Sequence, residues 1–170
     1  MTVAYALRDS NSHERLKAGT CSTTLKVDIS FREPVSAIEL VRLESRTRLH
    51  TYSLVDLVSE KLRAILQQAS RNRTRRQDVY DIDFLVGSQL LDYATQQAIL
   101  DVLRQKALSR GIEPTQDALS DPATKQRSEH NWQTLAQEVA TLPPFETAYA
   151  NVAVLPCLAL VSDREERWTP

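Results

Sequence analysis

Apolar and polar side chains alternate strictly between residues 25 and 31. The apolar positions are Leu25, Val27, Ile29 and Phe31, and the polar ones are Lys26, Asp28 and Ser30. Because side chains of a strand point alternately to its two faces, this pattern predicts a half-buried strand with Lys26 and Asp28 on its other face. Further short strands are expected at residues 3–7, 37–42 and 48–52.

The segment that follows has helical spacing and begins with a strong start signal. Ser53 followed three residues later by Asp56 is typical of a capping box, so we expect a helix to begin there. Apolar residues recur at helical spacing up to Leu66, and Lys61 projects near the middle of this apolar face. A lysine in that position either extends to solvent or has a partner.

A basic turn at residues 71–76 separates this helix from the next one. The second helix is expected from about residue 77 to residue 86, with Gly87 ending it. Asp78 and Asp81 lie one helical turn apart, so their carboxylates share one face of that helix. A cation and a pair of carboxylates therefore fall within one short segment.

The second half of the chain is expected to be mainly helical. Helices are expected at residues 92–110, around Trp132 and at residues 145–160, with a surface loop and a short helical turn at residues 112–128. Pro156 is expected to kink or end the last helix, and the tail from residue 162 to be frayed. A small sheet followed by helices makes the expected fold class α+β.

Composition narrows the function classes. The formal net charge of −1 gives the whole molecule no general attraction for nucleic acid or an acidic membrane surface. Only three glycines occur, which excludes a glycine-rich phosphate loop. Cys21 and Cys157 lie far apart without metal-ligand spacing, and no long apolar run is present, so we expect a cytoplasmic protein with reduced thiols and no membrane association.

Each candidate group has a structural alternative. Burying an unpaired ammonium costs several kcal/mol, so Lys61 is expected to meet a carboxylate, solvent or a phosphate. Asp78 and Asp81 could be caps that favour the helix dipole. The basic turn could be a solvated loop or a nucleic-acid contact. Lys26 and Asp28 could lie on the solvated face of a strand, or that face could place the Asp28 carboxylate beside a metal ion or phosphate.

Four segments together resemble the AbiEii/AbiGii family of nucleotidyltransferase-like toxins: LKVDIS, SEKLRAIL, the arginine-rich turn, and RQDVYDIDFL. The resemblance runs from about Leu25 through the helix around Trp132 to the closing LPPFETAYANV. It implies a polymerase β-type nucleotidyltransferase core with a helical C-terminal half. It also implies a toxin of a two-gene toxin–antitoxin or phage-abortive system that transfers a nucleotide from a nucleoside triphosphate, in some members onto tRNA.

The resemblance assigns roles to individual residues. It implies that Asp28 binds metal, that Lys61, Asp78 and Asp81 are catalytic, and that Lys26, Lys61 and Arg63 bind the nucleotide; Arg76 matches a further basic residue near these motifs. Mg²⁺ and a nucleoside triphosphate are the expected cofactor and substrate, and an antitoxin protein and tRNA are the expected partners. The implied domains are a truncated nucleotidyltransferase-like core at residues 1–87, a helical region at 88–161 and a tail at 162–170.

One family motif has no match. A glycine pair or Gly-Ser followed by D-x-D supplies two metal carboxylates in the family, and residues 1–24 hold no such sequence. We therefore expect a truncated protein that is incomplete or inactive alone, or one that borrows carboxylates from a partner chain. The remaining alternative is a non-catalytic module that binds RNA or an antitoxin through the basic turn. An open sheet edge at residues 25–31 also predicts a homo-oligomer.

Overall fold

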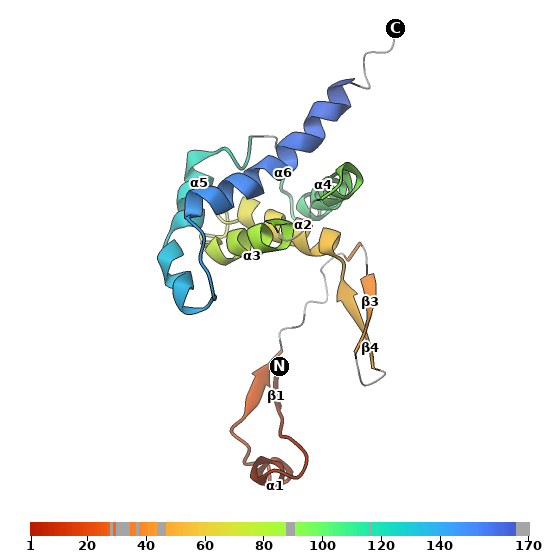
Figure 1. The fold of residues 1–170 in the computed structure, drawn as a ribbon, viewed down its shortest axis with the longest axis vertical. Coiled ribbons are helices and arrows are strands. Elements are labelled where there is room, and N and C mark those ends of the chain that lie inside the picture. The colour runs from red at the N-terminus through yellow and green to blue at the C-terminus, as the bar shows by residue number, and fades with distance from the viewer. Residues whose placement is uncertain are drawn as a thin grey trace. The chain divides into compact units, whose positions relative to one another are not determined.

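Strands precede most of the helices along the described part of the chain (Figure 1). The computed structural model describes residues 1–27, 29, 35–36, 38–43, 47–87, 91–115 and 117–165, with residues 156–165 described as backbone only. The elements in chain order are β1 (Thr2–Ala4), α1 (Asn11–Lys17), β2 (Thr24–Lys26), β3 (Ile38–Arg42), β4 (Arg48–Tyr52), α2 (Leu54–Leu66), α3 (Arg76–Gly87), α4 (Tyr93–Leu108), α5 (Pro122–Glu129), the 3₁₀ helix η1 (Trp132–Gln137) and α6 (Phe145–Glu165). This is the expected mixed α+β composition.

The chain divides into two units, Met1–Pro34 and Val35–Pro170. The N-terminal unit is an antiparallel pair of strands, β1 and β2, with α1 between them in sequence. Every residue of both strands is exposed, and α1 has no buried residue. Two three-residue strands and a seven-residue helix provide too little apolar surface to form a core of their own.

The strand predicted at residues 25–31 is confirmed only in part. Leu25 and Lys26 belong to β2, whereas Val27 and Ile29 lie outside it. The predicted half-burial is wrong, because Leu25 is 58% exposed and Ile29 is 54% exposed. The alternation was real, but within the described part of this unit no second layer covers the apolar face. Asp28 lies outside the described residues.

The larger unit begins with a second antiparallel pair, which confirms the strands predicted at residues 37–42 and 48–52. Ile38 lies opposite Tyr52, and Arg42 lies opposite Arg48. This hairpin leads into α2, whose start is also confirmed: the Ser53 hydroxyl accepts a hydrogen bond from the backbone N–H of Asp56 at 3.1 Å. The cap ends the strand and fixes the first turn of the helix.

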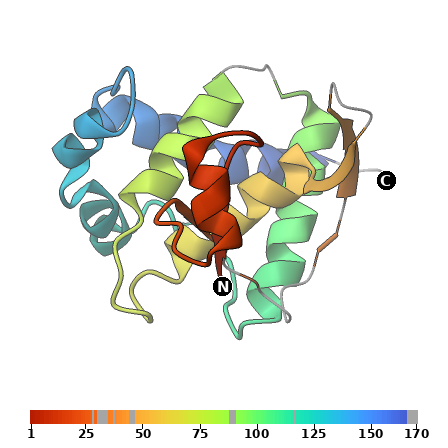
Figure 2. The ribbon, with the colours of Figure 1, turned by 90° about the horizontal axis from the view of Figure 1, so that it is seen from below.

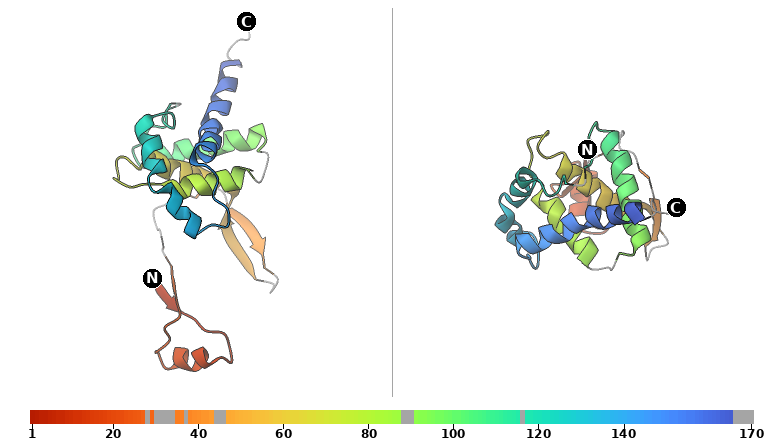
Figure 3. Two further views of the ribbon diagram at one scale, coloured as in Figure 1. Left: turned by 60° about the vertical axis from the view of Figure 1, so that its left-hand side comes forward. Right: turned by 90° about the horizontal axis from the view of Figure 1, so that it is seen from above.

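Helix α2 lies between α3 and α4 and contacts both, while α6 lies across α3 and α4 (Figure 2 and Figure 3). Their apolar faces form one core with residues contributed by the loop before α5 and by η1. Its buried members are Val58, Leu62, Ile65, Val79, Ile82, Ile99, Leu100, Leu103, Leu119, Trp132, Leu135, Phe145, Ala148, Tyr149, Val152 and Leu155. The division into domains at residue 87 stays a prediction.

Two predictions for the second half are corrected. The helical turn expected within the loop at residues 112–128 is a longer helix, α5, capped by the Asp121 carboxylate, which accepts hydrogen bonds from the backbone N–H groups of Ala123 and Thr124. Helix α5 has almost no apolar residues, so a search for apolar periodicity misses it. Helix α6 continues past Pro156 to Glu165 instead of ending there. No helix among the described residues is long and apolar enough to cross a membrane.

Candidate functional site

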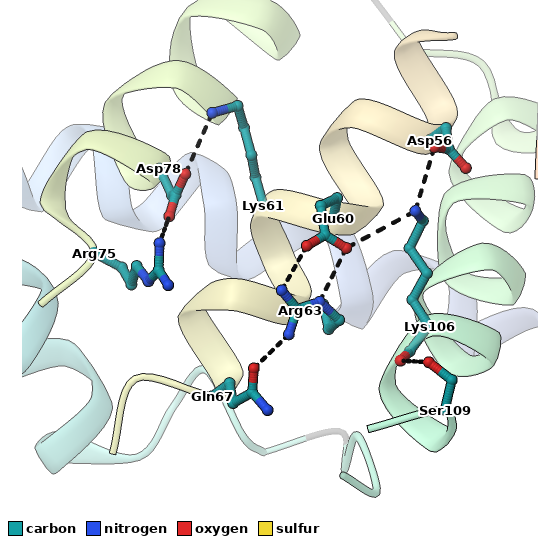
Figure 4. A network of polar contacts seen from close by, with 9 residues as sticks. All are labelled: Asp56, Glu60, Lys61, Arg63, Gln67, Arg75, Asp78, Lys106 and Ser109. Atoms are coloured by element: carbon teal, nitrogen blue, oxygen red, sulfur yellow. Dashed lines mark hydrogen bonds and ion pairs between the residues drawn. The ribbon is translucent and has the colours of Figure 1, made fainter. Parts of the chain in front are cut away.

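Lys61 reaches from α2 to two carboxylates on α3, Asp78 and Asp81. Figure 4 shows its contact with Asp78. Its Nζ atom lies 2.6 Å from Oδ2 of Asp81 and 3.3 Å from Oδ1 of Asp78. The other oxygen of Asp78 accepts a hydrogen bond from Nη1 of Arg75 at 3.4 Å. The structure thus brings together the lysine and both aspartates that the sequence singled out, in one cluster of two cations and two anions.

The packing of α2 against α3 explains this placement. Leu62 follows Lys61 and is fully buried, as are Val79 and Ile82, which directly follow Asp78 and Asp81. Each charged residue therefore stands next to a core residue, at the edge of the interface between the two helices. The side chain of Lys61 is 19% exposed, so its ammonium is mostly screened from water and still accessible.

Opposing effects act on the ammonium of Lys61. Burial lowers the pKa of Lys61, but the hydrogen bond to Asp81 and the negative charges of Asp78 and Asp81 raise it by more, so the pKa lies above its usual 10.5. Lys61 is consequently a cation throughout the physiological pH range. A cation held in place by two carboxylates suits the binding of an oxyanion better than proton transfer near neutral pH.

The same shift makes a prediction about stability. A lysine whose pKa is raised on folding contributes stability that is complete below its unfolded value of 10.5 and is lost as the pH rises through the higher folded value. The difference in the free energy of unfolding between the wild type and Lys61→Met is therefore expected to be constant from about pH 7 to pH 10 and to shrink above it. Urea denaturation of both proteins at each pH measures this difference. A difference that grows with alkalinity would contradict the ion-pair assignment.

A cleft of about 190 Å³ adjoins this cluster and is lined by arginines. The lining residues come from α2, from the loop before α3 and from the segment after α4: Arg63, Gln67, Arg71, Arg73, Arg75 and Arg110. The guanidinium of Arg63, predicted to bind the nucleotide, donates to both carboxylate oxygens of Glu60 and to Gln67 (Figure 4). Arg63 therefore contributes to the cleft with its charge already paired.

A buried ion pair on the other face of α2 was not predicted. Nζ of Lys106 on α4 lies 3.2 Å from Oδ2 of Asp56 and 3.8 Å from Oε2 of Glu60. The side chain of Lys106 is 1% exposed and that of Asp56 is fully buried. Oδ1 of Asp56 also accepts a hydrogen bond from the backbone N–H of Ser36 at 2.9 Å. Since Glu60 bonds to both Lys106 and Arg63, this network links the core of the helical unit to the arginine-lined cleft.

The two predicted site residues near the N-terminus, Lys26 and Asp28, are not part of the Lys61 cluster as the structure describes it. Lys26 is exposed on β2 in the N-terminal unit, and Asp28 lies outside the described residues. Among the described residues, no group of three or more histidine, cysteine, aspartate or glutamate side chains is arranged to hold a metal ion. Asp78 and Asp81 already accept hydrogen bonds from Lys61, a cation that takes the place a metal would need. The described residues therefore do not fit a magnesium site, and the metal role of Asp28 stays a prediction.

A comparison with protein families supplies an independent finding. The model of the family described as Nucleotidyl transferase AbiEii toxin, Type IV TA system, matches residues 8–151. The match spans both units and includes Lys26, Lys61, Asp78 and Asp81. No curated protein and no solved structure matches the chain.

Proposed function

Because the chain belongs to the AbiEii family of nucleotidyltransferase toxins, part of type IV toxin–antitoxin systems, we propose that Lys61 binds the phosphates of a nucleoside triphosphate substrate. The observation that carries this proposal is the ammonium of Lys61, fixed 2.6 Å from Asp81 and 3.3 Å from Asp78 and still partly exposed. The family implies a nucleoside triphosphate as substrate and an antitoxin as partner.

The chemistry of the ammonium supports this role. A lysine has three N–H donors, and the two hydrogen bonds to Asp78 and Asp81 leave one donor for a phosphate oxygen. Since the carboxylates hold the ammonium in position beforehand, little reorganisation is needed when negative charge develops during attack on phosphorus. In this proposal Asp78 and Asp81 are positioning residues that act through Lys61.

The charges of the cluster set a limit on what it does. Lys61 and Arg75 carry two positive charges, and Asp78 and Asp81 carry two negative ones, so the cluster is neutral. A neutral cluster orients a phosphate at short range without attracting it from a distance. The attraction for a polyanion must come from other cations of the site.

We further propose that the chain supplies only part of a complete nucleotidyltransferase site. The hairpins β1–β2 and β3–β4 are the remnants of a polymerase β-type sheet in this proposal, and residues 1–24 hold no D-x-D sequence. The described residues include Lys61 but no group of carboxylates arranged to bind a metal ion. Another polypeptide would supply the two metal carboxylates of the D-x-D motif, Asp28 would be the third, and tRNA is the proposed acceptor.

A transfer assay tests the completeness of the site. The purified chain, incubated with each labelled nucleoside triphosphate, Mg²⁺ and total tRNA, is expected to transfer no label above the background without protein. Asp28→Ala serves as the matched comparison, because Asp28 is the remaining candidate metal ligand. Transfer by the wild type that Asp28→Ala abolishes would show a complete site and would contradict this part of the proposal.

A further inference from the structure

Three guanidinium groups of the arginine-lined cleft carry charge that no carboxylate among the described residues balances. Arg63 is paired with Glu60, and Arg75 is paired with Asp78. For Arg71, Arg73 and Arg110, no ion pair forms with an acidic side chain among the described residues. Since the whole chain has a net charge of −1, this is a local concentration of positive charge and not a property of the entire surface. A concave site lined by one sign of charge raises the local concentration of the opposite ion.

The lining of the cleft indicates which anion it fits. Gln67 is the one lining residue that is not arginine, so the described lining offers no apolar or aromatic side chain on which a base could stack. Arginine binds phosphate through two parallel N–H donors, and such contacts hold a strand without reading its sequence. The residues therefore fit a series of phosphates better than a free nucleotide, whose base needs a pocket.

From these observations we propose that the arginine-lined cleft binds the phosphodiester backbone of a single nucleic-acid strand. Arg71, Arg73 and Arg110 contact its phosphates, and Arg63 and Arg75 complete the wall of the cleft. Arg75 also bonds to Asp78, so the strand lies beside the Lys61 cluster. That the bound strand is the acceptor for a triphosphate at Lys61 rests on the proposed function. That the cleft binds a strand does not.

Fluorescence polarisation with a labelled single-stranded RNA of mixed sequence tests the proposal. The wild type and the triple variant Arg71→Ala, Arg73→Ala, Arg110→Ala are titrated at several salt concentrations between roughly 50 and 200 mM. The variant is expected to bind at least tenfold more weakly at the lowest salt concentration. Its plot of log affinity against log salt is expected to be flatter by about 2, because each lost phosphate contact on a single strand removes about 0.7 from the slope.

A matched control separates the cleft from net charge. The triple variant Arg42→Ala, Arg48→Ala, Arg104→Ala removes the same charge from β3, β4 and α4, outside the cleft, and is expected to bind RNA within twofold of the wild type. A third variant replaces Arg71, Arg73 and Arg110 by lysine, which keeps the charge, and is expected to keep the salt slope. Because Arg71, Arg73 and Arg110 are exposed, their replacement leaves the core intact.

Three outcomes would overturn the proposal. The first is an equal loss of RNA affinity in the cleft variant and in the control variant. The second is wild-type affinity in the cleft variant. The third is a pair of results: ATP displaces the RNA from the wild type, and ATP binds more weakly to the cleft variant than to the wild type. The cleft would then be a triphosphate site. Lys61→Ala keeps every residue that lines the cleft and is expected to retain most of its RNA affinity while its nucleotide affinity falls at least tenfold, so the main loss of nucleotide binding and the main loss of RNA binding are observed in different variants.

Discussion

Lys106→Met is expected to lower the free energy of unfolding by about 3–5 kcal/mol, the cost of breaking a buried ion pair from one side. Methionine has nearly the volume of lysine, so the packing of α4 is kept while the charge is lost. The carboxylate of Asp56, fully buried and 3.2 Å from the ammonium in the wild type, then loses the cation that pairs with it among the described residues. Urea denaturation followed by circular dichroism measures the loss.

Arg104→Ala is the matched control, because Arg104 lies on the same helix and also forms an ion pair. Its Nη1 atom is 3.2 Å from Oδ1 of Asp101, but the two side chains are 43% and 63% exposed. An exposed pair contributes about 0–1 kcal/mol, so this variant is expected to unfold close to the wild type. Equal losses in the two variants would show that burial does not determine the strength of the Lys106 pair.

Lys61→Ala is expected to weaken nucleoside triphosphate binding about tenfold to a hundredfold, the range that corresponds to loss of one hydrogen bond between charged groups. The variant removes the donor to the phosphate, and it also leaves the carboxylates of Asp78 and Asp81 facing the incoming anion. Asp81→Asn is expected to have a smaller effect, because the amide oxygen still accepts a hydrogen bond from Lys61 and positions it. Calorimetric titration of nucleotide into each protein measures both effects.

The Lys61 cluster could be predicted because its parts lie close in sequence and show the right periodicity. The capping signal at Ser53 fixed the start of α2, and the spacing of Asp78 and Asp81 put both carboxylates on one face of α3. Two helices joined by a short basic loop pack against each other through their apolar faces. The side chains next to those faces then meet.

The sequence also contains a signal for the buried ion pair of Lys106. Lys106 lies beside Val102, Leu103 and Ala107, all of them buried, and so is a lysine in an apolar stripe like Lys61. The same argument about an ammonium that needs a partner applies to it. Its partner Asp56 is 50 residues away in sequence, so only the packing of α2 against α4 identifies the pair.

The arginine-lined cleft depends still more on tertiary structure. The sequence shows the basic turn at residues 71–76, but Arg110 joins it only because α4 ends beside the loop before α3. In the N-terminal unit, by contrast, the sequence predicts burial that the structure does not show. Alternation around Leu25 indicates a buried face, yet burial requires a second layer that the pattern of a single strand does not specify.

The most direct test of the central claim is a calorimetric titration of ATP, GTP, CTP and UTP, each with Mg²⁺, into the wild type, Lys61→Ala and Lys125→Ala. Lys125 pairs with Glu146 at 2.7 Å, away from the cluster, and controls for the loss of one lysine charge. The account predicts that at least one nucleotide binds to the wild type and to Lys125→Ala and binds at least tenfold more weakly to Lys61→Ala. Equal binding by all three proteins, or no binding of any nucleotide to the wild type, would contradict the claim that Lys61 holds the triphosphate.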